Sequence, residues 1–187
     1  MLVVCSWTSI LRRFDGSVDF RRNWNDYRNG FGDVNGEAWL GNEYLHYMTN
    51  ARPYKLRFDL EDWDGNTAYA EYASFVVTSE SDNYRLLLGA YSGTASADAN
   101  TDQINGFLYN NNAEFSTYDR DNDNRGVENC AADREGYGGF WHNSCTNVGA
   151  TTAYCPSAFC ASIYKMHWNA FDGYAGLKTL TMMMRPV

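Results

Sequence analysis

Regular alternation of apolar and polar residues is strongest between residues 53 and 91. Large apolar residues first occupy every second position: Tyr54, Leu56, Phe58 and Leu60. This period of two predicts a half-buried strand, and the Asp64–Gly65 pair predicts the turn that ends it. The segments TAYAEYASFVV and NYRLLLGAYSG extend the pattern. We therefore predict an antiparallel meander over residues 53–91, because short turns can join antiparallel strands directly.

The residues before this meander predict a strand and two short helices. A strand-like run follows Trp7, and turns are expected at Asp15–Gly16 and Asn29–Gly30. Between these turns, residues at helical spacing predict a short helix with one aromatic face: Phe20, Trp24 and Tyr27 or Arg28. Residues 37–50 predict a second short helix with these residues on one side: Trp39, Leu40, Tyr44 and Tyr47 or Met48.

The pattern changes after Gly93. Residues 94–175 are rich in Gly, Asn, Asp, Ser and Thr and have few periodic runs. A loop region of this length is uncommon in a compact domain unless it has a function. The last stretch, LKTLTMMMRP, alternates again and predicts a returning strand that closes the sheet. Its methionines are interpreted as core residues.

Composition limits the classes of function. The chain has 187 residues, 16% of them aromatic, which is sufficient for one well-filled core. A net charge of −8 argues against nucleic-acid binding, which needs a cationic face. The basic residues near the start are therefore interpreted as a solvated face: Arg12, Arg13, Arg21 and Arg22. No apolar run approaches the ~20 residues that span a bilayer, and the opening MLVV does not resemble a signal peptide.

Five cysteines leave one without a local partner. Cys130 with Cys145, and Cys155 with Cys160, are two plausible disulfide pairs, which leaves Cys5 alone. The alternative is a set of free, buried thiols. Disulfides predict a secreted, extracellular protein. An unpaired cysteine so close to residue 1 leads us to expect a fragment of a longer protein.

Three aspartates alternate in the loop region. Asp119, Asp121 and Asp123 can converge on a hard cation, and oxygen ligands favour calcium over zinc. The alternative is a solvated Asp/Asn turn. The loop is not an EF-hand, because neither the register from Asp119 nor that from Asp121 supplies the closing glutamate at position 12.

Several ordered motifs resemble one known family. They are RRFDGSVDF, the NW…Y…GFG segment, GEAWLGNE, FSTYDRDND followed by NCA, and the closing RP. Together they resemble the fibrinogen-like domain from about Trp7 to Pro186. The resemblance implies an α+β fold with a central antiparallel sheet, short helices and a loop-rich calcium-binding part. It implies one domain: residues 1–40 form a truncated N-terminal subdomain, 41–100 and 176–187 the central sheet, and 101–175 the loop-rich calcium- and ligand-binding subdomain.

The same resemblance implies a calcium site and a ligand pocket. Asp121 and Asp123 match the family's calcium-binding carboxylates, with carbonyls from Arg125, Gly126 or Val127 completing the site, and Asp119 as a flanking acid. Cys130–Cys145 matches the family's disulfide, whereas Cys155–Cys160 looks like an added small loop. A cis peptide is expected at Ser144–Cys145, which would aim the N–H groups of Cys145 and Thr146 at a ligand oxygen. The expected aromatic wall consists of Tyr137, Trp141, Tyr154 and Tyr174, and Ser162 and Ile163 replace a Tyr-Ala pair of the family.

The function implied is extracellular and calcium-dependent recognition. The leading interpretation is a lectin that binds acetylated glycans in innate immune defence. The alternative is a protein-ligand module that binds a receptor or the extracellular matrix. Arg134 and Thr146 stand where clotting-type holes have an acidic residue and a histidine, so we do not expect a clotting role. No Ser-His-Asp or Cys-His motif appears, so we do not expect an enzyme. We also expect that the protein can form a homo-oligomer through a missing N-terminal region.

Overall fold

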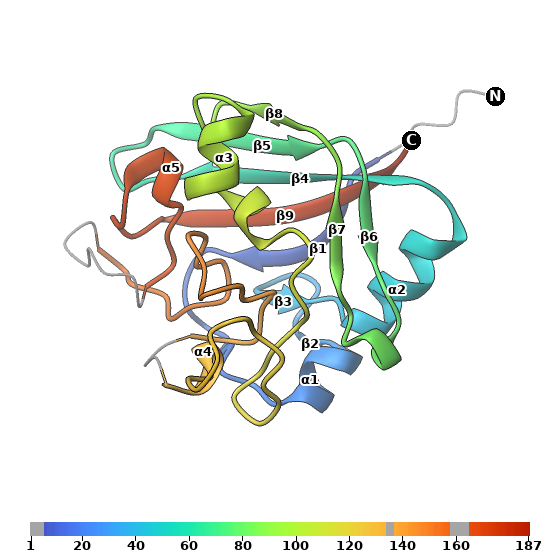
Figure 1. The fold of residues 1–187 in the computed structure, drawn as a ribbon. Coiled ribbons are helices and arrows are strands. Elements are labelled where there is room, and N and C mark those ends of the chain that lie inside the picture. The colour runs from blue at the N-terminus through green and yellow to red at the C-terminus, as the bar shows by residue number, and fades with distance from the viewer. Residues whose placement is uncertain (1–5, 134–136, 158–164) are drawn as a thin grey trace.

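A seven-stranded antiparallel sheet forms the centre of the computed structural model, which describes residues 6–133, 137–157 and 165–187 (Figure 1). The strands follow one another across the sheet in this order: β2 (Phe31–Gly32), β3 (Ala38–Trp39), β1 (Thr8–Arg13), β9 (Thr179–Pro186), β4 (Tyr54–Glu61), β5 (Thr67–Tyr72) and β8 (Tyr91–Gly93). The final strand, β9, thus lies in the middle, between β1 and β4. The expected α+β class with a central antiparallel sheet is confirmed.

Alternation along β4 and β9 produces one buried face. The predicted residues of β4, Tyr54 to Leu60 at every second position, are buried, and Gly65 adopts the left-handed φ of +84° in the following turn. On β9 the residues Leu180, Met182 and Met184 are buried. Phe58 pairs with Met182 across the two strands. The predictions of a strand after residue 53 and of a returning strand are confirmed. The methionine prediction holds for Met182 and Met184, whereas Met183 is only partly buried.

The predicted meander is wrong in one respect, because its outer part forms a separate sheet. β6 (Phe75–Val77) and β7 (Leu86–Leu88) pair with each other in a two-stranded sheet, while β5 and β8 remain in the large one. The bend between the two sheets lies at Ser74 and Gly89. A Cβ atom on Gly89 would come within 2.7 Å of the Ser74 backbone nitrogen, so this close crossing requires glycine. The short helix η1 (Glu80–Asp82) joins β6 to β7.

The first predicted helix is present as α1 (Trp24–Asn29), but Phe20, which was expected on its aromatic face, lies before it. The side chain of Asn23 caps it by accepting a hydrogen bond from the Asp26 N–H at 2.9 Å. Trp24 and Tyr27 are buried and form its aromatic face.

The second helix, α2 (Asn42–Ala51), starts later than predicted and buries another face. Trp39 lies in strand β3, and Gly41, with a φ of +114°, separates that strand from the helix. Counted from Asn42, helical spacing buries Leu45 and Thr49. The predicted face residues Tyr44 and Tyr47 are instead 58% and 63% exposed.

Arg13 and Glu37 form a buried ion pair, so the prediction that Arg13 belongs to a solvated face is wrong. Their side chains are 1% and 0% exposed, and the Arg13 Nε lies 3.6 Å from Glu37 Oε1. The Arg13 guanidinium also donates to the carbonyls of Ala150 and Thr152. Glu37 accepts hydrogen bonds from four backbone N–H groups of one loop: Phe14, Asp15, Gly16 and Val18. The pair therefore ties this loop to the sheet and to residues 150–152.

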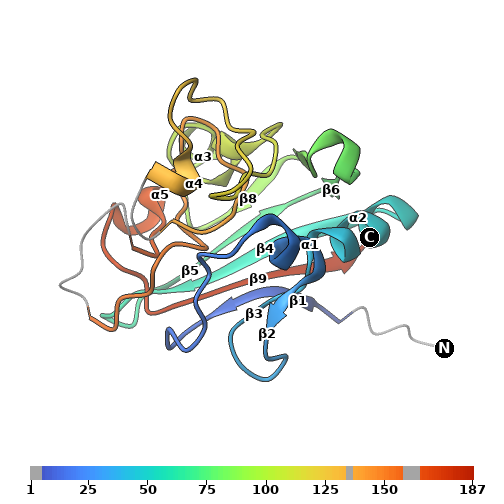
Figure 2. The ribbon, with the colours of Figure 1, turned by 90° about the horizontal axis from the view of Figure 1, so that it is seen from below.

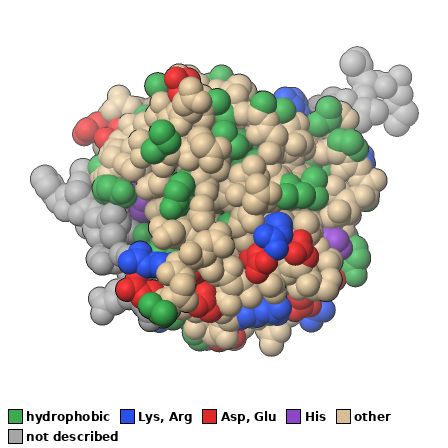
Figure 3. All heavy atoms as spheres, viewed as in Figure 1, with side chains coloured by type: hydrophobic (Ala, Val, Ile, Leu, Met, Phe, Trp, Pro, Cys, Tyr) green, Lys and Arg blue, Asp and Glu red, His purple; other side chains and the backbone are tan. Residues whose placement is uncertain are grey.

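Charged side chains on the surface are mixed in sign. Figure 3 shows basic and acidic groups next to one another on the face that it presents. Among the ion pairs are Arg28–Glu80 at 3.1 Å, Lys55–Glu71 at 3.3 Å and Lys178–Glu61 at 2.6 Å. In the described part of the sequence, no helix has the length and apolar character needed to cross a membrane.

The loop-rich region packs against the sheet through aromatic residues. Its helices are short: α3 (Ala99–Asn105), η2 (Phe107–Asn110), α4 (Cys130–Asp133) and α5 (Asn169–Asp172). Figures 1 and 2 show α3, α4 and α5 with their connecting loops on one side of the large sheet. Phe107 and Trp168 contact Phe58 of β4, with ring centroids 4.9 and 5.0 Å apart. The sheet therefore supplies a rigid base for a region that has little regular structure of its own.

Candidate functional site

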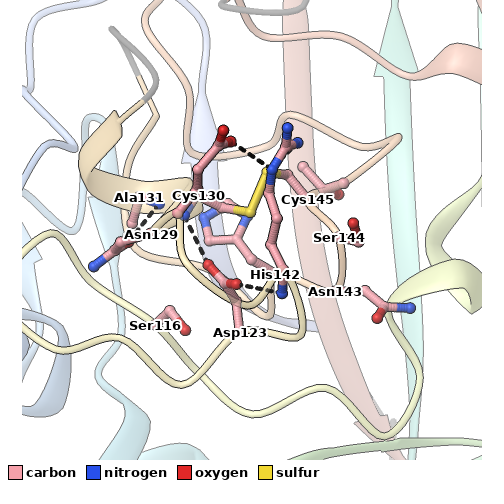
Figure 4. The surroundings of a disulfide bond; sticks show 12 residues. Ser116, Asp123, Asn129, Cys130, Ala131, His142, Asn143, Ser144 and Cys145 are labelled. Atoms are coloured by element: carbon pink, nitrogen blue, oxygen red, sulfur yellow. Dashed lines mark hydrogen bonds and ion pairs between the residues drawn. A yellow bond between two sulfur atoms is a disulfide. The ribbon is translucent and has the colours of Figure 1, made fainter.

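A disulfide joins the beginning of α4 to the loop that follows it in the sequence. Cys130 and Cys145 are bonded, with their Cα atoms 5.5 Å apart, which confirms the predicted pairing (Figure 4). Asn129 starts α4 by accepting hydrogen bonds from the N–H groups of Ala131 and Ala132. Of the second predicted pair, Cys155 is disulfide-bonded. Cys160 lies outside the described residues, as do Arg134, Ser162 and Ile163.

Asp123 organises the acidic loop. Its Oδ1 accepts a hydrogen bond from the Arg125 N–H at 2.8 Å, and its Oδ2 accepts one from the Cys130 N–H at 2.7 Å. Figure 4 shows Asp123 pointing toward Cys130 beside the disulfide. Asp121 Oδ1 accepts a hydrogen bond from the Asp123 N–H at 3.2 Å. The two carboxylates therefore lie on the same loop, held by backbone donors.

Asp119 has a different role. Its Oδ1 accepts hydrogen bonds from the Trp24 N–H at 3.0 Å and from the Thr117 hydroxyl at 2.7 Å. It thus joins the acidic loop to the start of α1. Its described hydrogen bonds are thus made within the protein, and its expected place beside a calcium ion stays a prediction.

The donor groups of the acidic loop fit a calcium ion. Each carboxylate has roughly four lone-pair sites, so the two hydrogen bonds that Asp123 accepts do not exhaust its capacity to bind a cation. Gly126 has a φ of +91° and Val127 is fully exposed, which leaves the backbone between Arg125 and Val127 accessible to an ion. Within the described ranges, no three His, Cys, Asp or Glu side chains are grouped as metal ligands. Backbone carbonyls and water would have to complete the coordination of a hard cation here.

A shallow hollow of about 160 Å³ opens beside Cys145. It is lined by Arg125, Tyr137, Ser144, Cys145, Thr146, Asn147 and Tyr174. The Ser144–Cys145 peptide bond is cis, as predicted. Among the described residues, the backbone N–H groups of Cys145 and Thr146 have no hydrogen-bond acceptor. The hollow is therefore lined by two residues whose backbone N–H groups are unpaired in the described structure, together with two tyrosines.

The structure assigns two of the predicted pocket residues elsewhere. Trp141 is 0% exposed and donates its indole N–H to the Tyr84 carbonyl, so it belongs to the core. Tyr154 donates its hydroxyl to the carbonyls of Phe14 and Lys178 and lines another hollow, beside Arg13. The side chains of Arg125 and Asn147 line the hollow and were not predicted to do so. The sequence signal that could have identified them is their closeness to Asp123 and Cys145, two residues that were predicted to belong to the site.

His142 lies buried beside the disulfide (Figure 4). Its Nε2 is 3.0 Å from the Gly138 carbonyl, an arrangement in which a neutral ring donates this hydrogen bond. Burial lowers the pKa of His142 from 6.5 to about 4. Burial also lowers the pKa of His167. Both rings are therefore neutral in the folded protein near neutral pH, and protonation of either ring would destabilise the fold.

These buried rings predict an acid-sensitive fold. A histidine whose pKa is lower in the folded state takes up a proton on unfolding, so its stabilisation is complete above pH 6.5 and decreases as the pH falls toward about 4. We expect the free energy of unfolding, measured in urea, to fall across this window. His142→Gln should make the fall shallower. An equal slope in His142→Gln and the parent would contradict the assignment.

Comparison with known proteins identifies relatives over almost the entire sequence. The sequence profile of the family described as fibrinogen beta and gamma chains, C-terminal globular domain, matches residues 4–187. Angiopoietin-related protein 7 of Mus musculus is 40% identical over 186 residues, which cover 96% of this chain and 51% of that protein. Fibrinogen-like protein 1 of Bos taurus is 39% identical over 188 residues, covering 96% of this chain and 59% of that protein. The chain thus spans about half the length of the curated relatives it matches.

Solved structures agree with this similarity. The fibrinogen-like globe domain of human ANGPTL2 superposes with a TM-score of 0.86 at 40% identity, over 96% of this chain and 80% of that one. A lamprey fibrin D-dimer, in complex with the peptide ligand Gly-His-Arg-Pro-amide, superposes with a TM-score of 0.85 at 33% identity. That match covers 100% of this chain and 63% of the other.

Proposed function

Because the chain belongs to the family of C-terminal globular domains found in the beta and gamma chains of fibrinogen, we propose that it is an extracellular module that binds a protein ligand. The family is non-enzymatic, so the site is interpreted as a recognition surface. Angiopoietin-related proteins are among its relatives, and the lamprey fibrin structure holds a peptide ligand. We assign ligand binding to residues 101–175, and we favour a module that binds a receptor or the extracellular matrix over a lectin.

The hollow beside Cys145 is the observation that supports this proposal. Its two backbone N–H donors, on Cys145 and Thr146, can hold one acceptor oxygen of a ligand, such as a peptide carbonyl. Tyr174, which is 40% exposed, offers a rigid apolar ring beside them. The disulfide between buried cysteines also fits an oxidising, extracellular environment.

Selection from a displayed peptide library on the immobilised domain tests the proposal. We expect enriched peptides that bind the parent and Tyr44→Ala but not Tyr174→Ala. Tyr44 is a matched control, because it is an exposed tyrosine on α2, outside the residues that line the hollow. Peptides that bind Tyr174→Ala as tightly as the parent would contradict the use of this hollow.

Recognition of acetylated glycans is the second candidate function. The pair of N–H donors would suit an acetyl carbonyl, with Tyr137 and Tyr174 beside the methyl group. A glycan array, read with and without EDTA, separates the two functions. Retention of N-acetylglucosamine but not glucose, combined with no enriched peptide, would favour the lectin.

We further propose that calcium binds at Asp121 and Asp123, with carbonyls from Arg125 and Val127, and keeps the hollow ordered. Calcium supplies positive charge that offsets the repulsion between the two carboxylates. Asp123 already receives two backbone N–H groups, so its replacement would also disturb the loop without calcium. Asp121 is the cleaner target, because it is exposed.

Asp121→Asn is therefore expected to weaken calcium binding at least tenfold in titration calorimetry, since it removes one of two charged ligands. In the parent, calcium at ~100 times its dissociation constant should raise the free energy of unfolding by roughly 2.7 kcal/mol. Asp98→Asn, at an exposed aspartate that caps α3, serves as the control. Calcium binding equal to that of the parent in Asp121→Asn would show that the ion lies elsewhere.

A further inference from the structure

Arg125 is the charged residue that lines the hollow. Its Nη1 lies 3.6 Å from the Sγ of Cys145, and its side chain is 31% exposed. Its Nε lies 2.6 Å from the Oε2 of Glu128. Since a guanidinium carries five N–H donors in a planar fork, the Nη edge remains able to bind a second group.

The other described residues that line the hollow add polar groups but no second charge. The backbone N–H groups of Cys145 and Thr146 lack acceptors in the described structure. The Thr146 hydroxyl is already bonded to Asn110 and to the Val148 carbonyl, and the Asn147 amide donates to the Ile104 carbonyl. The hollow thus combines two unused backbone donors with one guanidinium.

We propose that this hollow binds a carboxylate and that Arg125 selects the carboxylate over a neutral carbonyl group. The inference rests on the proposed function and adds the chemical class of the bound group: an acidic side chain or the C-terminal end of the protein ligand. One carboxylate oxygen accepts from the Cys145 and Thr146 N–H groups. The other accepts from the Nη edge of Arg125, because a guanidinium and a carboxylate match in shape and charge.

Glu128 competes with the ligand for Arg125. It is the acidic residue that pairs with the guanidinium, and its own side chain is 51% exposed. Asp121 and Asp123 lie on the same loop, but the bonds of Asp123 described above are made to the backbone N–H groups of Arg125 and Cys130. Removing the charge of Glu128 should therefore strengthen carboxylate binding, whereas removing the charge of Arg125 should weaken it.

Titration of this 187-residue chain with two matched probes, followed by NMR, tests the inference. N-acetylglycine carries an acetyl group and a carboxylate, and its methylamide replaces the carboxylate with a neutral amide. We expect the parent to prefer N-acetylglycine about tenfold, as a charge-assisted hydrogen bond would give. The shifts should include the amide signals of Cys145 and Thr146.

The variants decide whether Arg125 causes the preference. Arg125→Gln should bind both probes equally, and Glu128→Gln should increase the preference for N-acetylglycine. Arg12→Gln is the control and should keep the preference, because it removes the same charge at an exposed position of β1. Equal binding of the two probes by the parent, with shifts at Cys145, would overturn the carboxylate inference but leave the proposed site intact. A preference retained in Arg125→Gln would also overturn it. Failure of both probes to shift Cys145 and Thr146 would contradict the inference and the proposed use of the hollow together.

Discussion

Replacement of Glu37 by alanine is expected to lower the free energy of unfolding by about 3–5 kcal/mol, the usual effect of removing one partner of a buried ion pair. Glu37 is completely buried, and its loss would remove the carboxylate that pairs with the buried Arg13 guanidinium, which would keep its hydrogen bonds to the carbonyls of Ala150 and Thr152. Burial already lowers the pKa of Arg13, and the carboxylate of Glu37 opposes that shift. Four backbone N–H groups of the loop 14–18 would also lose their acceptor. Equilibrium unfolding in urea measures the effect.

Glu61→Ala is the matched control for this experiment. Glu61 pairs with Lys178 at 2.6 Å, but the two side chains are 29% and 43% exposed. Water screens such a pair, so its removal should cost less than about 1 kcal/mol. Equal losses in Glu37→Ala and Glu61→Ala would show that the buried pair does not support the fold.

Removal of the Cys130–Cys145 disulfide is the second large effect that we expect. The bridge closes a loop with a sequence separation of 15. In the chain-entropy model, opening a loop of this size costs about 3 kcal/mol, because the unfolded polypeptide regains freedom. The double variant Cys130→Ala/Cys145→Ala should therefore unfold at lower urea concentration. It should also bind selected peptides less tightly, because the bridge joins α4 to the hollow.

The control for the disulfide is Cys5→Ala, which removes a cysteine predicted to have no partner within this sequence. Its stability and peptide binding should match those of the parent. Substitution of both cysteines is used in place of a reducing agent, because a reducing agent would also break the disulfide of Cys155. A loss below about 1 kcal/mol in the double variant would contradict the entropic estimate.

The regular strands could be predicted from the sequence because burial repeats at every second residue. On β4 and β9 every second residue faces the core, so apolar side chains recur with a period of two. The α2 region was harder, because Trp39 and Leu40 precede a helix whose exposed face also carries tyrosines. Tyrosine tolerates both core and surface, so its spacing alone did not identify the buried face.

The polar interior could not be predicted from local sequence. Arg13 follows Arg12, and both are charged, yet Arg12 is exposed while Arg13 meets Glu37 in the core. Arg13 and Glu37 are 24 positions apart, so local sequence does not reveal their pairing. The same limit applies to the hollow: motif spacing predicted Cys145 and Tyr174, but whether Trp141 or Arg125 faced the ligand depended on the tertiary packing.

The central position of β9 affects when the protein can fold during its synthesis. β9 pairs with β1 through Thr8 and Met184, and with β4 through Lys55 and Arg185. Because the ribosome makes the N-terminus first, β1 and β4 are complete long before their shared partner exists. The nascent polypeptide therefore carries unpaired strand edges and an uncovered apolar sheet face through most of translation, a state that aggregates readily and needs chaperones. A premature stop shortly before Thr179 would remove the middle of the sheet, so almost the whole sequence must emerge before the large sheet can be completed.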